Sequence, residues 1–195
     1  INIFDYKINK NLIYLDVFPI SQYQITPRKI LNRDFFRNIS TYEEQLFAFD
    51  EQIKLAIEFN KPLYLHQRDA HEDFIKIIQK YKDDISNAVV HCFTGTKDAL
   101  NDYLELGFHI GLTGWVCDER RNVELRQIIK DIPHDKLMIE TDSPFLAPAP
   151  HRGALNTPAQ IANIVRAMAA ERNEDVAELA TALSDNAERI FGSFA

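Results

Sequence analysis

The sequence predicts a parallel α/β fold, a barrel of the TIM type that is partial, with the last four βα units behind an irregular N-terminal stretch. Short apolar segments alternate with helical patterns at intervals of about 20 to 28 residues, which is typical of successive βα units on a parallel sheet. Polar side chains recur at equivalent ends of these segments, and a closed barrel brings such ends to one face. An open doubly wound sheet also fits the alternation, but the polar side chains favour the barrel.

The elements follow one another from residue 40 onward, after 39 residues that are hard to interpret. Residues 12–18 are a candidate strand, and a capping-box spacing at Ser40 followed by an apolar stripe predicts a helix over about 41–59. The expected strands are 62–66, 88–93, 108–112 and 136–141, and the expected helices lie around 74–81, 100–104, 123–129, 161–168 and 176–190. We therefore expect an atypical segment over 1–39 and the C-terminal portion of a barrel over 40–195.

Composition excludes several classes of protein. The 195 residues are 46% hydrophobic and 26% charged, which is typical of one globular domain, and no apolar run reaches the roughly 18 residues of a membrane span. The two cysteines, Cys92 and Cys117, do not form a disulfide framework or a C-x-x-C pair. We expect a soluble cytoplasmic protein. Its net charge of −7 opposes non-specific binding to nucleic acid, so such a substrate needs local help from a bound cation.

Three residues are candidate metal ligands, because His66, His91 and Asp142 each fall at a strand end or one residue past it. Two imidazoles and a carboxylate suit Zn, Mn or Mg and can acidify a bound water. Glu140 precedes Asp142 by two residues, so the two carboxylates share a face, and Glu140 can orient a water or a ligand histidine. The alternatives are ordinary polar residues at strand-to-loop junctions and, for Glu140, a partner for a basic group.

Other residues are candidates for substrate contact. Arg68 and Arg152 follow the candidate ligands and can hold a phosphate or form structural ion pairs, and Trp115 can line the pocket, stack on a base or simply pack. Asp69 is a candidate helix cap. We interpret residues 118–121 as a solvated charged turn and Cys92 as a small buried apolar group.

Five stretches together resemble the TatD family of metal-dependent deoxyribonucleases. They are residues 91–95 (His-Cys-Phe-Thr-Gly), 114–121 (Gly-Trp-Val-Cys-Asp-Glu-Arg-Arg), 140–144 (Glu-Thr-Asp-Ser-Pro), 150–153 (Pro-His-Arg-Gly) and 186–192 (Asn-Ala-Glu-Arg-Ile-Phe-Gly). Their order and spacing match over about residues 34–193. The resemblance implies a TIM-barrel hydrolase that cleaves phosphodiester bonds in DNA, with metal ligands at His66, His91 and Asp142 and a supporting Glu140.

The N-terminal part departs from this family. Its opening His-x-His pair has no counterpart, because no histidine precedes His66, and its bridging glutamate corresponds to Ile30. Asp5, Asp16 and Asp34 are the first candidates for substitute ligands.

Three hypotheses follow for the function. The first is a metal-dependent deoxyribonuclease, with activity impaired by the missing ligands. The second is a catalytically inactive barrel fragment that binds partners or self-associates through exposed sheet edges, and the first residue, Ile1 rather than Met, favours it. The third is an amidohydrolase acting on a small amide or ester, against which the runs at 91–95 and 114–121 argue.

Overall fold

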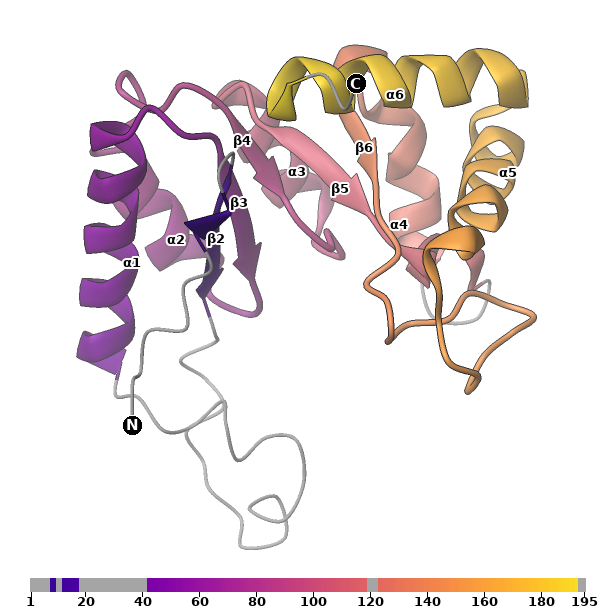
Figure 1. The fold of residues 1–195 in the computed structure, drawn as a ribbon, viewed down its shortest axis with the longest axis horizontal. Coiled ribbons are helices and arrows are strands. Elements are labelled where there is room, and N and C mark those ends of the chain that lie inside the picture. The colour runs from indigo at the N-terminus through magenta and orange to yellow at the C-terminus, as the bar shows by residue number, and fades with distance from the viewer. Residues whose placement is uncertain (1–7, 10–11, 18–41, 119–122, 193–195) are drawn as a thin grey trace, which may run out of the picture. The chain divides into compact units, whose positions relative to one another are not determined.

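The computed structural model describes residues 8–9, 12–17, 42–118 and 123–192, and the chain divides into two compact units, Ile1–Ala88 and Val89–Ala195 (Figure 1). Strands and helices alternate along both units. Each unit has its own parallel strand pairing, which agrees with the α/β class that the sequence predicts.

Three strands pair side by side in the first unit. β1 (Ile8–Asn9) runs antiparallel to β2 (Leu12–Val17), and β2 runs parallel to β3 (Leu63–Gln67). The register places Asp16 opposite His66. The two strands that the sequence predicted here are therefore confirmed, and β2 extends regular structure into the N-terminal stretch.

Two helices of the first unit pack against each other through their apolar faces. α1 (Tyr42–Glu58) confirms the predicted helix, whereas the proposed cap at Ser40 lies outside the described residues. α2 (His71–Ile78) follows β3. The rings of Phe49 on α1 and Phe74 on α2 stack with centroids 5.2 Å apart, and both residues are buried.

The second unit contains a parallel sheet of three strands. β4 (Ala88–Val90) pairs with β5 (His109–Leu112), and β5 pairs with β6 (Leu137–Ile139), all in parallel (Figure 1). The pairing continues past β6, where Glu140 N–H donates to the Leu112 carbonyl at 3.0 Å. The carboxyl ends of all three strands therefore lie along one edge of this sheet.

Helices connect and follow these strands. They are α3 (Lys97–Glu105), α4 (Val123–Ile128), α5 (Ile161–Arg172) and α6 (Val176–Phe191), with 3-10 turns η3 (Gly114–Cys117), η4 (Ile129–Asp131), η5 (His134–Lys136) and η6 (Pro158–Gln160). Side-chain caps fix two of the helix starts, because Thr96 Oγ1 accepts from Ala99 N at 3.3 Å and Asp175 Oδ1 accepts from Ala177 N at 2.9 Å. Among the described helices, none combines the length and the apolarity that crossing a membrane requires.

Two polar side chains tie the C-terminal helices to the segment that precedes β6. The Asn186 amide on α6 is 2% exposed and donates to the carbonyls of His134, at 2.6 Å, and Leu137, at 2.8 Å. The Arg172 guanidinium at the end of α5 donates to the Ile129 carbonyl at 2.7 Å. These bonds hold the start of β6, and β6 leads directly into the polar residues of the candidate site.

Candidate metal centre

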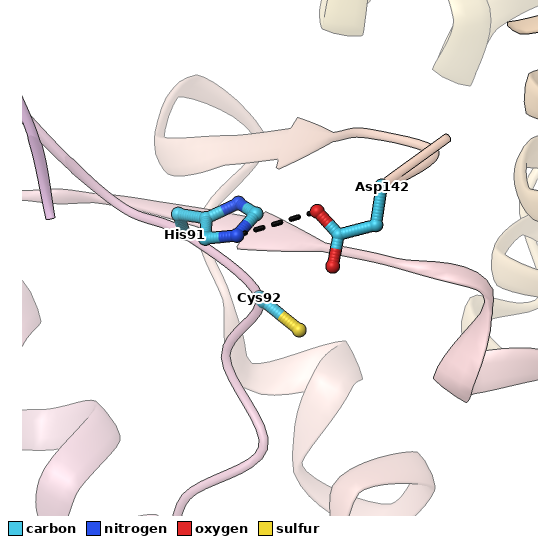
Figure 2. Close-up of side chains that lie close together, drawn as sticks. All are labelled: His91, Cys92 and Asp142. Carbon is cyan, nitrogen blue, oxygen red and sulfur yellow. Dashed lines mark ion pairs between the residues drawn. The ribbon is translucent and has the colours of Figure 1, made fainter. Parts of the chain in front are cut away.

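His91 and Asp142 meet at the carboxyl ends of β4 and β6. His91 follows β4 directly, and Asp142 comes shortly after the end of β6. His91 Nε2 lies 3.3 Å from Asp142 Oδ1, and the two side chains are 9% and 23% exposed (Figure 2). The structure thus brings two of the three candidate ligands together within the second unit.

Glu140 contacts the other side of the His91 ring. Its Oε2 lies 2.6 Å from His91 Nδ1, and its Oε1 accepts from the Cys92 backbone N–H at 2.6 Å. In its ionised form the Glu140 carboxylate accepts the proton of Nδ1, and this tautomer leaves the Nε2 lone pair facing Asp142. Glu140 therefore orients the histidine.

Cys92 belongs to the same cluster. Its backbone is left-handed, with φ of 51°, and its thiol, the imidazole of His91 and the carboxylate of Asp142 each offer a donor atom within 4.8 Å of the other two (Figure 2). Cys92 Sγ also lies 3.7 Å from Thr113 Oγ1. Cys92 is buried, as the sequence predicts, and its thiol also contacts polar side chains on two other segments.

Burial controls the protonation of the two carboxylates. It raises the pKa of Glu140 from 4.5 to about 8. The negative charge of Asp142 also raises this pKa, whereas the hydrogen bond from the Cys92 backbone N–H lowers it. Burial also raises the pKa of Asp142, and a hydrogen bond from the Cys92 thiol opposes it. The centre therefore favours a bound proton or a cation over two free carboxylate charges.

These residues fit a divalent metal. Two donor atoms of a tetrahedral zinc site, each about 2.0 to 2.1 Å from the ion, are about 3.3 Å apart, which matches the separation of His91 Nε2 and Asp142 Oδ1. The Glu140 contact behind the histidine is the supporting interaction that metal-bound histidines usually have.

The third candidate ligand, His66, lies in the first unit. It is half-buried on β3 with Asp16 as its register partner, and Asp5 and Asp34 lie outside the described residues. Convergence of His66 with His91 and Asp142 stays a prediction.

Two further residues follow β3. Arg68 is half-buried, and Asp69 is exposed with φ of 55°. The expected cap at Asp69 is wrong, because Ala70 occupies the N-cap position of α2 without a side-chain cap, and its N–H donates to Gln67 Oε1 at 3.1 Å.

Arg152 forms an ion pair with Asp118. The two residues lie on different loops: Asp118 follows β5 and η3, and Arg152 follows β6. The side chain of Asp118 is 5% exposed and that of Arg152 is 32% exposed. The interpretation of Asp118 as part of a solvated turn is therefore wrong, while residues 119–121 lie outside the described part of the chain. Trp115 is half-buried on η3, where its backbone N–H donates to Thr113 Oγ1 at 3.4 Å.

The loop that carries Arg152 is anchored at its base. The Asn156 amide, 2% exposed, donates to the carbonyls of Thr141 and Phe145, both at 2.5 Å. Gly114 lies close to the same loop, since a Cβ on it would come within 2.7 Å of the Leu146 carbonyl. Glycine is required at this close approach, and the contact fixes the turn that bears Trp115.

Sequence reasoning missed two residues of this region, Cys92 and Asp118. Both stand inside the stretches that match the family motifs, and that position was the one available signal. Neither the left-handed backbone of Cys92 nor the distant partner of Asp118 can be recognised from its immediate neighbours in the sequence.

Imidazole and carboxylate groups at the carboxyl ends of parallel strands are the arrangement of TIM-barrel metal hydrolases. A family model described as TatD related DNase matches residues 33–192 of this chain. The chain belongs to the TatD related DNase family, as the five motifs predicted.

Named relatives and solved structures agree with this assignment. The 3'-5' ssDNA/RNA exonuclease TatD of Pantoea vagans is 44% identical over 162 residues, which are 81% of this chain and 62% of the relative. The enzyme of the same name from Escherichia coli K12 is 44% identical over 163 residues, which are 82% of this chain and 63% of that protein. This chain thus spans about three fifths of the length of these curated relatives.

The solved structures give the fold. YjjV, a TatD homologue from Escherichia coli K12, matches with a TM-score of 0.75 at 26% identity, over 96% of this chain and 64% of that one. A TatD family hydrolase from Entamoeba histolytica matches with a TM-score of 0.70 at 23% identity, over 79% of this chain and 59% of its own. The match confirms the α/β fold class with parallel strands.

Proposed function

We propose that this chain hydrolyses phosphodiester bonds in DNA at a divalent-metal centre built on His91 and Asp142. The observation that carries the proposal is the continuous line of contacts from Glu140 through the His91 ring to Asp142, at 2.6 and 3.3 Å. The family assignment and the relatives named as single-stranded DNA and RNA exonucleases support a nucleic-acid substrate.

The side chains divide the work of such a reaction. A divalent metal at this centre, whether Zn, Mg or Mn, supplies acidification of a water molecule and stabilises charge on the phosphate. Glu140 fixes the His91 ring and keeps Nε2 directed at Asp142. Burial raises the pKa of the Asp142 carboxylate, which favours a cation beside it over a free negative charge. His66 on β3 stays the third candidate ligand that the sequence predicts.

Substrate contacts come from the loops at the strand ends. Arg152 is the candidate phosphate contact on the loop after β6, and its ion pair with Asp118 sets the position of the guanidinium. Arg68 is the corresponding candidate after β3, and Trp115 offers a ring on which a base can stack. A net charge of −7 makes such local cations necessary for a polyanionic substrate. We place this activity in the cytoplasm, which is supported by the fact that Cys92 and Cys117 do not form a disulfide bond.

A labelled-oligonucleotide assay tests the proposal. The purified chain is incubated with single-stranded DNA or RNA labelled at either end, with Mg, Mn or Zn and with a chelator. Progressive shortening from the 3' end, abolished by chelation and by Asp142→Ala but kept in the surface variant Asp98→Ala, is the expected result. Absence of cleavage with metal bound would overturn it and leave the inactive fragment as the better hypothesis.

A further inference from the structure

We propose that the Cys92 thiolate is a direct metal donor, which makes His91, Cys92 and Asp142 a soft metal site within the second unit. The inference deepens the proposed function, since it concerns the same metal centre. It changes the expected metal preference from oxygen-loving ions such as Mg²⁺ toward Zn²⁺ and other thiophilic cations.

The backbone of Cys92 makes this possible. Successive residues of an extended strand direct their side chains to opposite faces, so His91 and Cys92 would diverge if β4 continued. Cys92 instead has φ of 51°, and the strand ends at Val90. The result is that donor atoms from adjacent residues lie within 4.8 Å of each other and of a carboxylate oxygen of Asp142 (Figure 2).

The distances suit one small ion. Zinc bonds are about 2.0 to 2.1 Å to nitrogen and about 2.3 Å to sulfur, so a nitrogen and a sulfur on one tetrahedral ion are about 3.6 Å apart. The nitrogen–oxygen separation of 3.3 Å already fits, and the sulfur, which lies within 4.8 Å of both atoms, needs a side-chain movement of up to about 1.2 Å to reach the tetrahedral separation.

One carboxylate holds both adjacent residues in place. Glu140 Oε2 contacts the His91 ring at Nδ1, and Glu140 Oε1 accepts from the backbone N–H of Cys92, each at 2.6 Å. The short hydrogen bond fixes the backbone position from which the Cys92 side chain extends, and it is made to a carboxylate whose side chain is 12% exposed. The same contacts leave the Nε2 of His91 and the Sγ of Cys92 as the atoms that face Asp142.

The chemistry of binding is a proton exchange. The S–H bond of Cys92 breaks, a sulfur–metal bond forms, and the proton leaves to the buffer, with no change of oxidation state. The competing explanation is that the thiol only forms hydrogen bonds: it donates to Asp142, and in its contact with Thr113 Oγ1, at 3.7 Å, either atom can be the donor. In that case a metal binds without sulfur.

Cobalt and cadmium distinguish the two explanations spectroscopically. The metal-free full chain is titrated with Co²⁺ or Cd²⁺, and sulfur-to-metal charge-transfer absorption is recorded. We expect one equivalent to produce the band in the unmodified chain and in Cys117→Ser, whose thiol lies on η3 and serves as the matched control. Cys92→Ser and Cys92→Ala should lose the band and bind Zn²⁺ about tenfold more weakly or worse.

A second measurement does not depend on whether the Cys92 variants fold, because it leaves Cys92 unchanged. In the Cys117→Ser variant the remaining thiol is Cys92, and Zn²⁺ should slow its alkylation by iodoacetamide in proportion to occupancy, whereas Mg²⁺ should not. Bound Co²⁺ without a band, or alkylation indifferent to bound Zn²⁺, would overturn the thiolate ligand. Metal-dependent DNA cleavage would still stand in that case, and a band without cleavage would overturn the hydrolase proposal alone.

Discussion

The carboxylate of Glu140 occupies the space beside Gly111 that a side chain at that position would fill: a Cβ on Gly111 would lie 2.9 Å from Glu140 Oε1 and 3.2 Å from the Val90 carbonyl. Gly111 lies in the middle of the sheet, on β5 between β4 and β6. The bare backbone there gives Glu140 room to contact both His91 and Cys92.

Gly111→Ala should therefore weaken metal binding as well as folding. The added methyl group forces the Glu140 carboxylate to move, because the Val90 backbone cannot, and overpacking of this kind costs about 1 to 3 kcal/mol. Urea unfolding and Zn²⁺ titration measure the two effects. Gly95→Ala is the control, since its Cβ would meet the Phe93 ring at 2.8 Å instead of a site carboxylate. Equal loss of metal affinity in both variants would contradict the role of Gly111.

Glu140→Gln should lower metal affinity about 10- to 100-fold while the chain stays folded. The amide oxygen can accept from the Cys92 N–H, but the amide nitrogen then donates to His91 Nδ1, which forces the ring proton onto Nε2. A protonated Nε2 has no lone pair for a metal. Isothermal titration with Zn²⁺ measures the change, and the exposed Glu105→Gln is the control. Unchanged affinity in Glu140→Gln would show that Glu140 does not set the tautomer.

Asp118 and Arg152 should be energetically coupled. A buried carboxylate beside a partly exposed guanidinium predicts a coupling free energy of about 0.5 to 3 kcal/mol in a double-mutant cycle of Asp118→Asn and Arg152→Gln. Urea unfolding of the four proteins gives this value. Additive effects would mean that the ion pair does not hold the loop after β6.

The pH dependence of stability should include a contribution from Glu174. Burial alone would raise the pKa of Glu174, but hydrogen bonds from Arg172, at 3.0 Å, and from His134 lower it below 4.5. A carboxylate with a depressed pKa stabilises the fold above its unfolded value and loses that contribution as pH falls through the folded value. Glu174→Gln should thus be less stable at neutral pH, on the order of 1 kcal/mol.

The difference between Glu174→Gln and the unmodified chain should shrink as the pH falls below about 4.5. Urea unfolding across this range measures it, with the exposed Glu105→Gln again as the control. A difference that grows on acidification would contradict the sign of the shift.

Regular elements with strong periodicity could be predicted from the sequence. The apolar stripe through Phe49 and Ile53 gave α1 within a residue or two of its observed bounds, because helix burial depends on spacing alone. The strand expected over 88–93 ends instead at Val90, since the left-handed backbone at Cys92 cannot continue a ladder. Cys92 and Phe93 are apolar residues that fit a strand, so the sequence pattern does not show that the chain changes direction there.

Residues of the candidate site could be predicted only where their position relative to a strand end places them in the site. His91 and Asp142 could be recognised from their places after strands, since parallel strands align their carboxyl ends. Asp118 could not, because its burial depends on Arg152, which arrives from another loop. In the sequence pattern Asp118 is equivalent to the three charged residues that follow it, so its tertiary contact with Arg152 cannot be predicted from that pattern.

Cys92 and Asp142 both adopt positive φ, 51° and 56°, and neither is glycine. This conformation costs an L-residue roughly 1 to 2 kcal/mol, less for aspartate than for most others. Glycine at either position would relieve that strain and remove a donor atom. Selection of this protein for thermal stability alone should therefore enrich variants that have lost the metal centre. Selection for activity should instead retain Cys92 and Asp142, although their backbone conformation lowers the stability of the fold.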